Sequence, residues 1–307
     1  MAEAVGVVGA GIMGSGIAEV AARSGCDVVV REVDAAACER GRARIATSLS
    51  RAVRAGKISA GERDEALGRI GFTTDWADLA DRDLVVEAVI EDEAEKIAVF
   101  QALDKVLPPD GRCVLASNTS SIPIMKLAAV TERPELVIGM HFFNPVPVLP
   151  LVELVPSLLT ATETLHRAEE FATGRLGKHT VLSKDRAGFV VNALLIPYLL
   201  AAVRMVESGF ASADDVDTAM VAGCAHPMGP LALTDLIGLD TTAAVAQSMY
   251  AEFKEPLYAP PPLLLRMVEA GLLGRKAGRG FFDYRTEAPA RASASAGSGS
   301  PGPAALS

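Results

Sequence analysis

Apolar positions in residues 1–185 fall into short runs that alternate with longer stretches of helical spacing. The central runs are rich in valine and do not alternate with polar residues, which is typical of strands covered on both faces. The runs lie at residues 5–8, 28–31, 84–89, 113–116, 137–140, 151–154 and 180–182. Helical spacing lies at residues 12–24, 35–54, 93–106 and 163–176. This alternation predicts an α/β domain with a doubly wound, mostly parallel sheet.

The pattern changes in residues 186–285, where strand signals end and helix signals follow one another. Ser212 and Asp215 have the spacing of a capping box and open one of these helices. The other helical stretches lie at residues 189–207, 227–240, 241–253 and 262–270. We therefore predict a second, smaller, all-helical domain over residues 186–285.

Residues 286–307 consist mostly of alanine, serine, glycine and proline. Such a segment has few large apolar side chains to bury, so burial cannot offset the entropy lost on ordering. We predict a disordered tail here.

Composition narrows the class of protein. Half of the residues are hydrophobic and the formal net charge is −9, which argues against a nucleic-acid partner because those proteins carry a basic surface. The four cysteines have neither a CxxC spacing nor a Cys/His metal spacing. They indicate a reducing compartment and no metal site.

No membrane partner is expected. The N-terminus lacks the basic segment of a signal peptide. The longest apolar run, residues 188–206, is interrupted by Asn192, Pro197 and Arg204, so a buried helix fits it better than a membrane span. We expect a cytoplasmic protein.

A glycine motif follows the first predicted strand. Gly9, Gly11 and Gly14 form GxGxxG, which gives a tight turn, close approach of a pyrophosphate and tight helix–strand packing. The next predicted strand ends at Glu32, where an acid can bind the ribose hydroxyls and repel a 2′-phosphate. The neighbouring Arg31 could bind the 2′-phosphate of NADP. The pattern as a whole nevertheless favours a Rossmann-type domain that binds NAD over NADP.

The chain has four histidines. His166 and His179 lie in polar surroundings, and His226 precedes a proline, which suits a structural or a pocket role. His141 directly follows an apolar strand, and ligands of doubly wound sheets bind beyond the carboxyl ends of the strands. It is the candidate proton carrier, although a buried structural histidine fits the same position.

Several blocks of sequence together resemble the 3-hydroxyacyl-CoA dehydrogenase family. They are SNTSS at 117–121, HFFNPVP at 141–147, LVELV at 151–155, GFVVN at 188–192, PMGP at 227–230, DLIGLD at 235–240 and GRKAGRGF at 274–281. Their order spans nearly the whole chain, and the chain length resembles the short-chain bacterial members called 3-hydroxybutyryl-CoA dehydrogenases.

The resemblance implies roles for individual residues. His141 exchanges the proton of the 3-hydroxyl, Glu153 holds the other ring nitrogen, and Ser120 and Asn192 bind the substrate oxygen of an (S)-isomer. The implied NAD contacts, in addition to the three glycines and Glu32, are Glu91, Lys96, Asn144 and Lys276.

The resemblance also places an acyl-CoA thioester against the helix at 35–54. Its implied contacts are Ser48, Arg51, Arg54 and Lys57, although a solvated basic helix face explains the same charges. As in the family, we expect a homodimer formed through the helical domain.

Some segments depart from the family pattern. Residues 184–187 read KDRA where members often have Thr-Pro, and Leu149-Pro150 and Cys224-Ala-His226 are unusual. His226 is compatible with a polar acyl end, as in a 3-hydroxyadipyl-CoA dehydrogenase of aromatic catabolism. A free sugar-acid dehydrogenase of the L-gulonate type and a non-enzymatic NAD-binding protein remain as alternatives.

Overall fold

The computed structural model describes residues 3–109 and 111–285. The chain divides into two compact units. The first contains the residues up to Leu200 together with Ala244–Pro260, and the second contains Ala201–Ala243 and the chain from Pro261 onward. The predicted tail at 286–307 lies outside the described residues.

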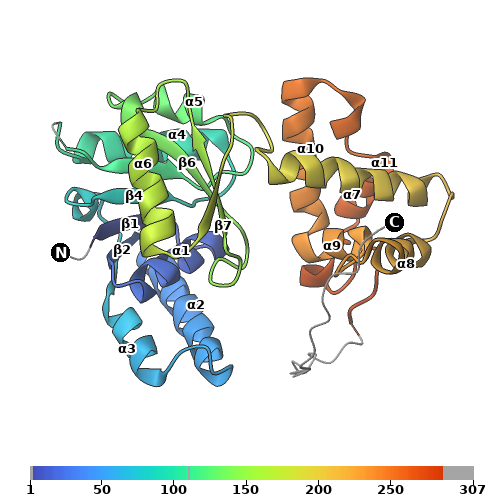
Figure 1. Cartoon of the computed structure of the whole chain (residues 1–307), viewed down its shortest axis with the longest axis horizontal. Helices are drawn as coiled ribbons and strands as arrows, with labels where there is room; N and C mark the ends of the chain where they lie inside the picture. The colour runs from blue at the N-terminus through green and yellow to red at the C-terminus, as the bar shows by residue number, and fades with distance from the viewer. Residues whose placement is uncertain (1–2, 110, 286–307) are drawn as a thin grey trace, which may run out of the picture. The chain divides into compact units, whose positions relative to one another are not determined.

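An eight-stranded sheet forms the centre of the first unit, with the order β3-β2-β1-β4-β5-β6-β7-β8 (Figure 1). All neighbouring strands are parallel except β6 and β7, which are antiparallel. The strands are β1 Ala4–Val8, β2 Asp27–Arg31, β3 Ile70–Thr73, β4 Leu84–Glu87, β5 Val114–Ser117, β6 Val137–Phe142, β7 Leu151–Pro156 and β8 His179–Leu182. The predicted doubly wound, mostly parallel sheet is confirmed.

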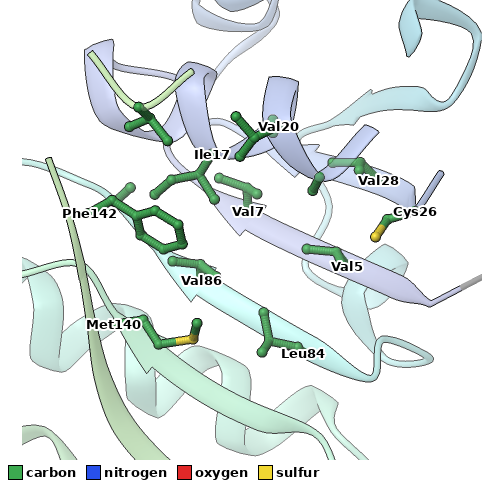
Figure 2. Close-up of a cluster of buried hydrophobic side chains, with 14 of the residues drawn as sticks. Val5, Val7, Ile17, Val20, Cys26, Val28, Leu84, Val86, Met140 and Phe142 are labelled. Carbon is green, nitrogen blue, oxygen red and sulfur yellow. The ribbon is translucent and has the colours of Figure 1, made fainter. Parts of the chain in front are cut away.

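Helices cover both faces of this sheet. They are α1 Ile12–Arg23, α2 Ala35–Arg54, α3 Ala60–Gly68, α4 Glu93–Val106, α5 Ile124–Ala128 and α6 Thr162–Glu170. Successive strand residues point to opposite faces. Leu84 and Val86 therefore join one cluster with α1, and Val85 joins the other with α4. Figure 2 shows the first cluster, where Ile17 of α1 faces Val7 and Val86 of the sheet.

The sequence pattern missed three elements of the first unit. β3 is a short edge strand with one buried residue, Ile70, so its apolar signal is weak. α3 is a short helix that opens with a capping box between Ser59 and Glu62. α5 has only five residues. The hydrophobic pattern is weakest where an element is short or half-covered.

Helices follow β8 in the described part of the chain. They are α7 Val191–Glu207, α8 Ala213–Cys224, α9 Pro230–Ile237, α10 Leu239–Phe253 and α11 Pro262–Glu269. The first residues of α7 and the last of α10 group with the sheet, and the remainder forms the second unit. Within the second unit, Asp217 accepts hydrogen bonds from the first amides of α9, Leu231 N and Ala232 N, both at 2.8 Å. Among the described helices, none is long and apolar enough to cross a membrane.

Candidate active site

His141 and Glu153 lie directly opposite each other on the antiparallel strands β6 and β7. Opposed residues of neighbouring strands point to the same face of a sheet, so the two side chains meet. His141 Nδ1 lies 2.7 Å from Glu153 Oε2. The imidazole is 5% exposed and the carboxylate is fully buried. When Nδ1–H donates to Glu153, the other nitrogen, Nε2, is left as an acceptor.

The second oxygen of Glu153 binds the beginning of α7. Oε1 accepts hydrogen bonds from Val190 N at 3.0 Å and from Val191 N at 2.8 Å. These bonds fix the carboxylate and satisfy free amides at the helix start. Asn192 is the next residue along α7, so the same bonds place it one residue from the Glu153 contact.

The free nitrogen of the imidazole meets Ser120. Ser120 Oγ lies 3.1 Å from His141 Nε2, and the serine follows the carboxyl end of β5. Phe143 and Phe189 flank the imidazole, with ring centroids 4.6 and 5.5 Å away. The structure therefore brings Ser120, His141 and Glu153 into one hydrogen-bonded line, with aromatic rings beside the imidazole.

The glycine motif has the shape of a dinucleotide cradle. Gly9 has φ +94°, and a Cβ at Gly14 would lie 1.8 Å from the carbonyl oxygen of Gly9. In contrast, a Cβ at Gly11 meets nothing within 4 Å among the residues that the structure describes. Gly11 is the N-cap of α1 and has no side chain that could cap the first amides of the helix, and Gly11 and Ile12 are both exposed. These residues fit the pyrophosphate of a dinucleotide.

Glu32 directly follows β2 and contacts the glycine loop. Its Oε1 accepts a hydrogen bond from Ala10 N at 2.5 Å, and its Oε2 accepts one from Val33 N at 3.0 Å. The Arg31 guanidinium instead lies over the Trp76 ring, 3.9 Å from its centroid. The Glu32 carboxylate therefore contacts the loop directly, and the guanidinium of Arg44 also donates a hydrogen bond there, to the carbonyl oxygen of Ala10.

The glycine loop and His141 lie on the same edge of the sheet, because β1, β4, β5 and β6 all run parallel. Comparison with known proteins then decides the family. The sequence model described as 3-hydroxyacyl-CoA dehydrogenase, NAD binding domain, matches residues 4–186. The model of the C-terminal domain of the same enzymes matches residues 188–284.

The chain belongs to the 3-hydroxyacyl-CoA dehydrogenase family.

Individual relatives agree with this membership. The chain is 64% identical to a 3-hydroxybutyryl-CoA dehydrogenase of Mycobacterium tuberculosis over 91% of this chain and 98% of the relative. The crystal structure of (S)-3-hydroxybutyryl-CoA dehydrogenase PaaH1 from Ralstonia eutropha superposes with a TM-score of 0.87 at 44% identity, covering 93% of this chain and all of that one. The human mitochondrial hydroxyacyl-coenzyme A dehydrogenase is 40% identical over 92% of this chain and 91% of its own length. As a member of the 3-hydroxyacyl-CoA dehydrogenase family, the chain is an NAD-dependent enzyme.

The remaining NAD contacts that the family resemblance implies lie in different settings. Asn144 is exposed in the loop after β6. Lys96 is 1% exposed, and its ammonium lies between Glu87 and Glu91. Lys276 belongs to the second unit, where it forms a 2.6 Å ion pair with Asp240. Their contacts with NAD therefore stay predictions.

The predicted thioester contacts of this 3-hydroxyacyl-CoA dehydrogenase lie on α2 and just after it. Arg51, Arg54 and Lys57 are exposed, and Ser48 is half-buried. Ser48 hydrogen-bonds the buried Glu19 of α1, whose pKa burial raises and this bond lowers in part. His226 is half-buried after α8, in the second unit.

Sequence reasoning missed a residue beneath the site. Glu87 is fully buried at the end of β4, where its carboxylate contacts Lys96 and Ser117. The sequence does contain a signal for Glu87, because a glutamate inside an apolar strand must have hydrogen-bond or ion-pair partners. Which partners it finds depends on the fold.

Proposed function

We propose that the chain catalyses the reversible NAD-dependent oxidation of (S)-3-hydroxyacyl-CoA to 3-ketoacyl-CoA, with short chains such as 3-hydroxybutyryl-CoA and acetoacetyl-CoA as substrates. The observation that carries the mechanism is the line from Ser120 Oγ through the imidazole of His141 to Glu153. The naming of several relatives as 3-hydroxybutyryl-CoA dehydrogenases supports the short acyl chain.

Oxidation of the alcohol removes a proton from the 3-hydroxyl oxygen and a hydride from the carbon that bears it. Gly9, Gly11, Gly14 and Glu32 would hold NAD⁺, which when bound would supply the hydride acceptor. His141 Nε2 takes the hydroxyl proton and returns it when the ketone is reduced. Proton transfer by a positioned side chain is worth about 10²–10⁴-fold in rate.

The neighbours of His141 prepare it for this step. Glu153 fixes the tautomer in which Nε2 carries no proton and can accept one, and it stabilises the imidazolium that forms. Ser120 and Asn192 orient the substrate oxygen toward Nε2. Phe143 and Phe189 keep water away from the imidazole, which strengthens its interaction with the carboxylate.

The CoA part of the substrate carries phosphates, for which Ser48, Arg51, Arg54 and Lys57 provide a hydroxyl and exposed cations.

We infer a cytoplasmic location from the cysteines, which are all free, with Cys26, Cys38 and Cys113 buried.

We also infer a homodimer formed through the helical domain. In the helical domain, α7, α8, α9 and the turn between α7 and α8 expose large apolar side chains. Exposed apolar side chains mark interaction surfaces when they form a contiguous patch. The exposed side chains here are Met205, Phe210, Val221 and Leu236. Light scattering after gel filtration tests the inference, and a monomeric mass at micromolar concentration would contradict it.

Oxidation of NADH in the presence of acetoacetyl-CoA, followed by absorbance, tests the proposed reaction. We expect turnover with the thioester and with NADH in preference to NADPH. Turnover with free hydroxy acids but not with the thioester would favour a sugar-acid dehydrogenase. A faster rate with a dicarboxylyl thioester would favour the 3-hydroxyadipyl-CoA alternative, and no turnover would leave an NAD-binding protein.

A further inference from the structure

A chain of three charged side chains, two of them buried, connects the carboxyl ends of β4 and β5 to the loop that carries Ser120. It consists of Glu87, Lys96 and Glu91. Glu87 is fully buried and Lys96 is 1% exposed, whereas the Glu91 side chain is 39% exposed. Charges buried to this degree are costly unless each has partners, so their contacts show what the chain holds in place.

Glu87 joins the two strand ends. Its Oε1 accepts hydrogen bonds from Lys96 Nζ at 2.6 Å and from Val89 N at 2.7 Å. Its Oε2 accepts one from Ser117 Oγ, also at 2.6 Å. Ser117 is the last residue of β5, and its hydroxyl in turn accepts a hydrogen bond from Thr119 N at 3.2 Å.

Lys96 links Glu87 to Glu91. Its ammonium lies 3.3 Å from Glu91 Oε2, in addition to its contact with Glu87. Burial acts to raise the pKa of Glu91, but Lys96 and the hydrogen bonds from Thr119 and Ser120 lower it. Glu91 is therefore a carboxylate that this neighbourhood keeps charged.

Glu91 fixes the segment around Ser120. Its Oε1 accepts hydrogen bonds from Thr119 Oγ1 at 2.6 Å and from Ser120 N at 2.8 Å. Ser121 Oγ donates to the same oxygen at 3.2 Å. One carboxylate oxygen thus holds three consecutive residues, and the middle one places its hydroxyl on His141 Nε2.

We propose that Glu87 and Lys96 are positioning residues for Ser120: through Glu91 they set the backbone of residues 119–121 and so the contact between Ser120 Oγ and His141 Nε2. The proposal rests on the proposed function for its kinetic consequences. In this proposal the Lys96 ammonium acts on the two carboxylates that enclose it, Glu87 and Glu91. This role differs from the direct NAD contact that the family resemblance implies for Lys96.

A double-mutant cycle in kcat tests the proposal. Lys96→Met keeps most of the side-chain length and removes the charge, and Glu87→Gln keeps the shape of the carboxylate. We expect each to lower kcat for acetoacetyl-CoA reduction by about tenfold in the wild-type background and by less than about threefold in a Ser120→Ala background, because residues that act through one group are not additive. Equal losses in both backgrounds would overturn the proposal.

Matched variants guard against a general effect on folding. Lys126→Met removes a lysine that pairs with Glu93 at 2.7 Å on the surface, with both side chains about half exposed, and should leave kcat unchanged. Thr119→Val removes the hydrogen bond to Glu91, together with the two that Thr119 Oγ1 accepts from Ser121 N and Ile122 N, and leaves the buried charges in place. It should lower kcat in the wild-type background only, so it serves as a second test if Lys96→Met does not fold.

A spectroscopic measurement separates this proposal from the proposed function. The ¹⁵N resonance of His141 Nε2, assigned by its loss in His141→Ala, reports the Ser120 contact without any turnover. Lys96→Met and Glu87→Gln should move it in the same direction as Ser120→Ala does, and Lys126→Met should not. A resonance that stays in place in the Lys96 and Glu87 variants overturns the proposal even if the enzyme proves fully active.

Discussion

At the scale of single residues, Glu153 explains why the site needs a carboxylate and not simply an acceptor. It accepts from the imidazole of His141 on one oxygen and from two amides of α7 on the other. A side chain with only one acceptor atom cannot satisfy both sets of donors. The sequence could identify Glu153 through the family motif, but its bond to α7 follows from the folded chain alone.

Glu153→Gln tests this double role. The amide NH₂ must face either the imidazole N–H or the α7 amides, and either choice sets donor against donor. We expect kcat to fall by about two orders of magnitude or more while the Kd of NADH changes little. The check is steady-state kinetics with acetoacetyl-CoA together with a fluorescence titration of NADH. An amide variant with wild-type kcat would show that the carboxylate is not needed.

Glu32 provides a second prediction at this scale. Its carboxylate lies on the glycine loop through Ala10, where we expect it to repel a 2′-phosphate. Glu32→Ala should lower the ratio of kcat/KM for NADH to that for NADPH by about tenfold or more. Asp34→Ala is the control, because Asp34 carries the same charge and caps α2 through Ala37 N. If both variants keep the wild-type ratio, Glu32 does not set the preference.

At the scale of elements, the hydrophobic pattern predicted the central strands and the exposed edge strand β8, and it missed the short strand β3 at the other edge. It also ended the strand before His141, whereas β6 continues through Phe142. The pairing of β6 with β7 brings His141 and Glu153 together. The local hydrophobic pattern does not indicate which strands pair, so it could not predict this contact. The polar partners of Glu87 were out of reach for the same reason.

The loop between β6 and β7 is fastened by a residue from elsewhere in the chain. Lys178 is 8% exposed, and its ammonium donates to the carbonyl oxygens of Val146 and Leu149, both at 2.8 Å. Lys178→Met leaves both carbonyls without this donor. We expect the free energy of unfolding to fall by about 1–3 kcal/mol, measured by urea denaturation. Lys184→Met, at an exposed lysine, should change it by less than about 0.5 kcal/mol, and equal losses would contradict the role of Lys178.

At the scale of the whole molecule, the predicted boundary near residue 185 lies in the segment between β8 and α7. The compact units divide later, since residues 186–200 and 244–260 group with the sheet. Contacts made by side chains far away in the sequence account for this grouping. Ala187 N donates to Glu252, Gly188 packs against Met249, and Phe189 is buried in a sheet cluster. A helical periodicity shows that these residues form helices but not what they pack against.

The cysteines give a prediction for the folded molecule. Burial raises the pKa of Cys113 to about 12 and that of Cys26 to about 11, and it also raises the pKa of Cys38. Because the thiolate is the reactive form, Cys113 is ionised to only about 10⁻⁴ at pH 8. Cys224 is exposed. An aromatic disulfide reagent should therefore modify one thiol quickly in the native protein, and Cys224→Ser should abolish that phase. Rapid modification that persists in Cys224→Ser would contradict the burial of the others.

The central claim is that the imidazole of His141, held by Glu153 at 2.7 Å, carries the proton of the thioester substrate. The kcat of His141→Ala for the reduction of acetoacetyl-CoA by NADH tests it most directly. We expect a loss of about two orders of magnitude or more, with the Kd of NADH nearly unchanged. A wild-type kcat in this variant would contradict the account.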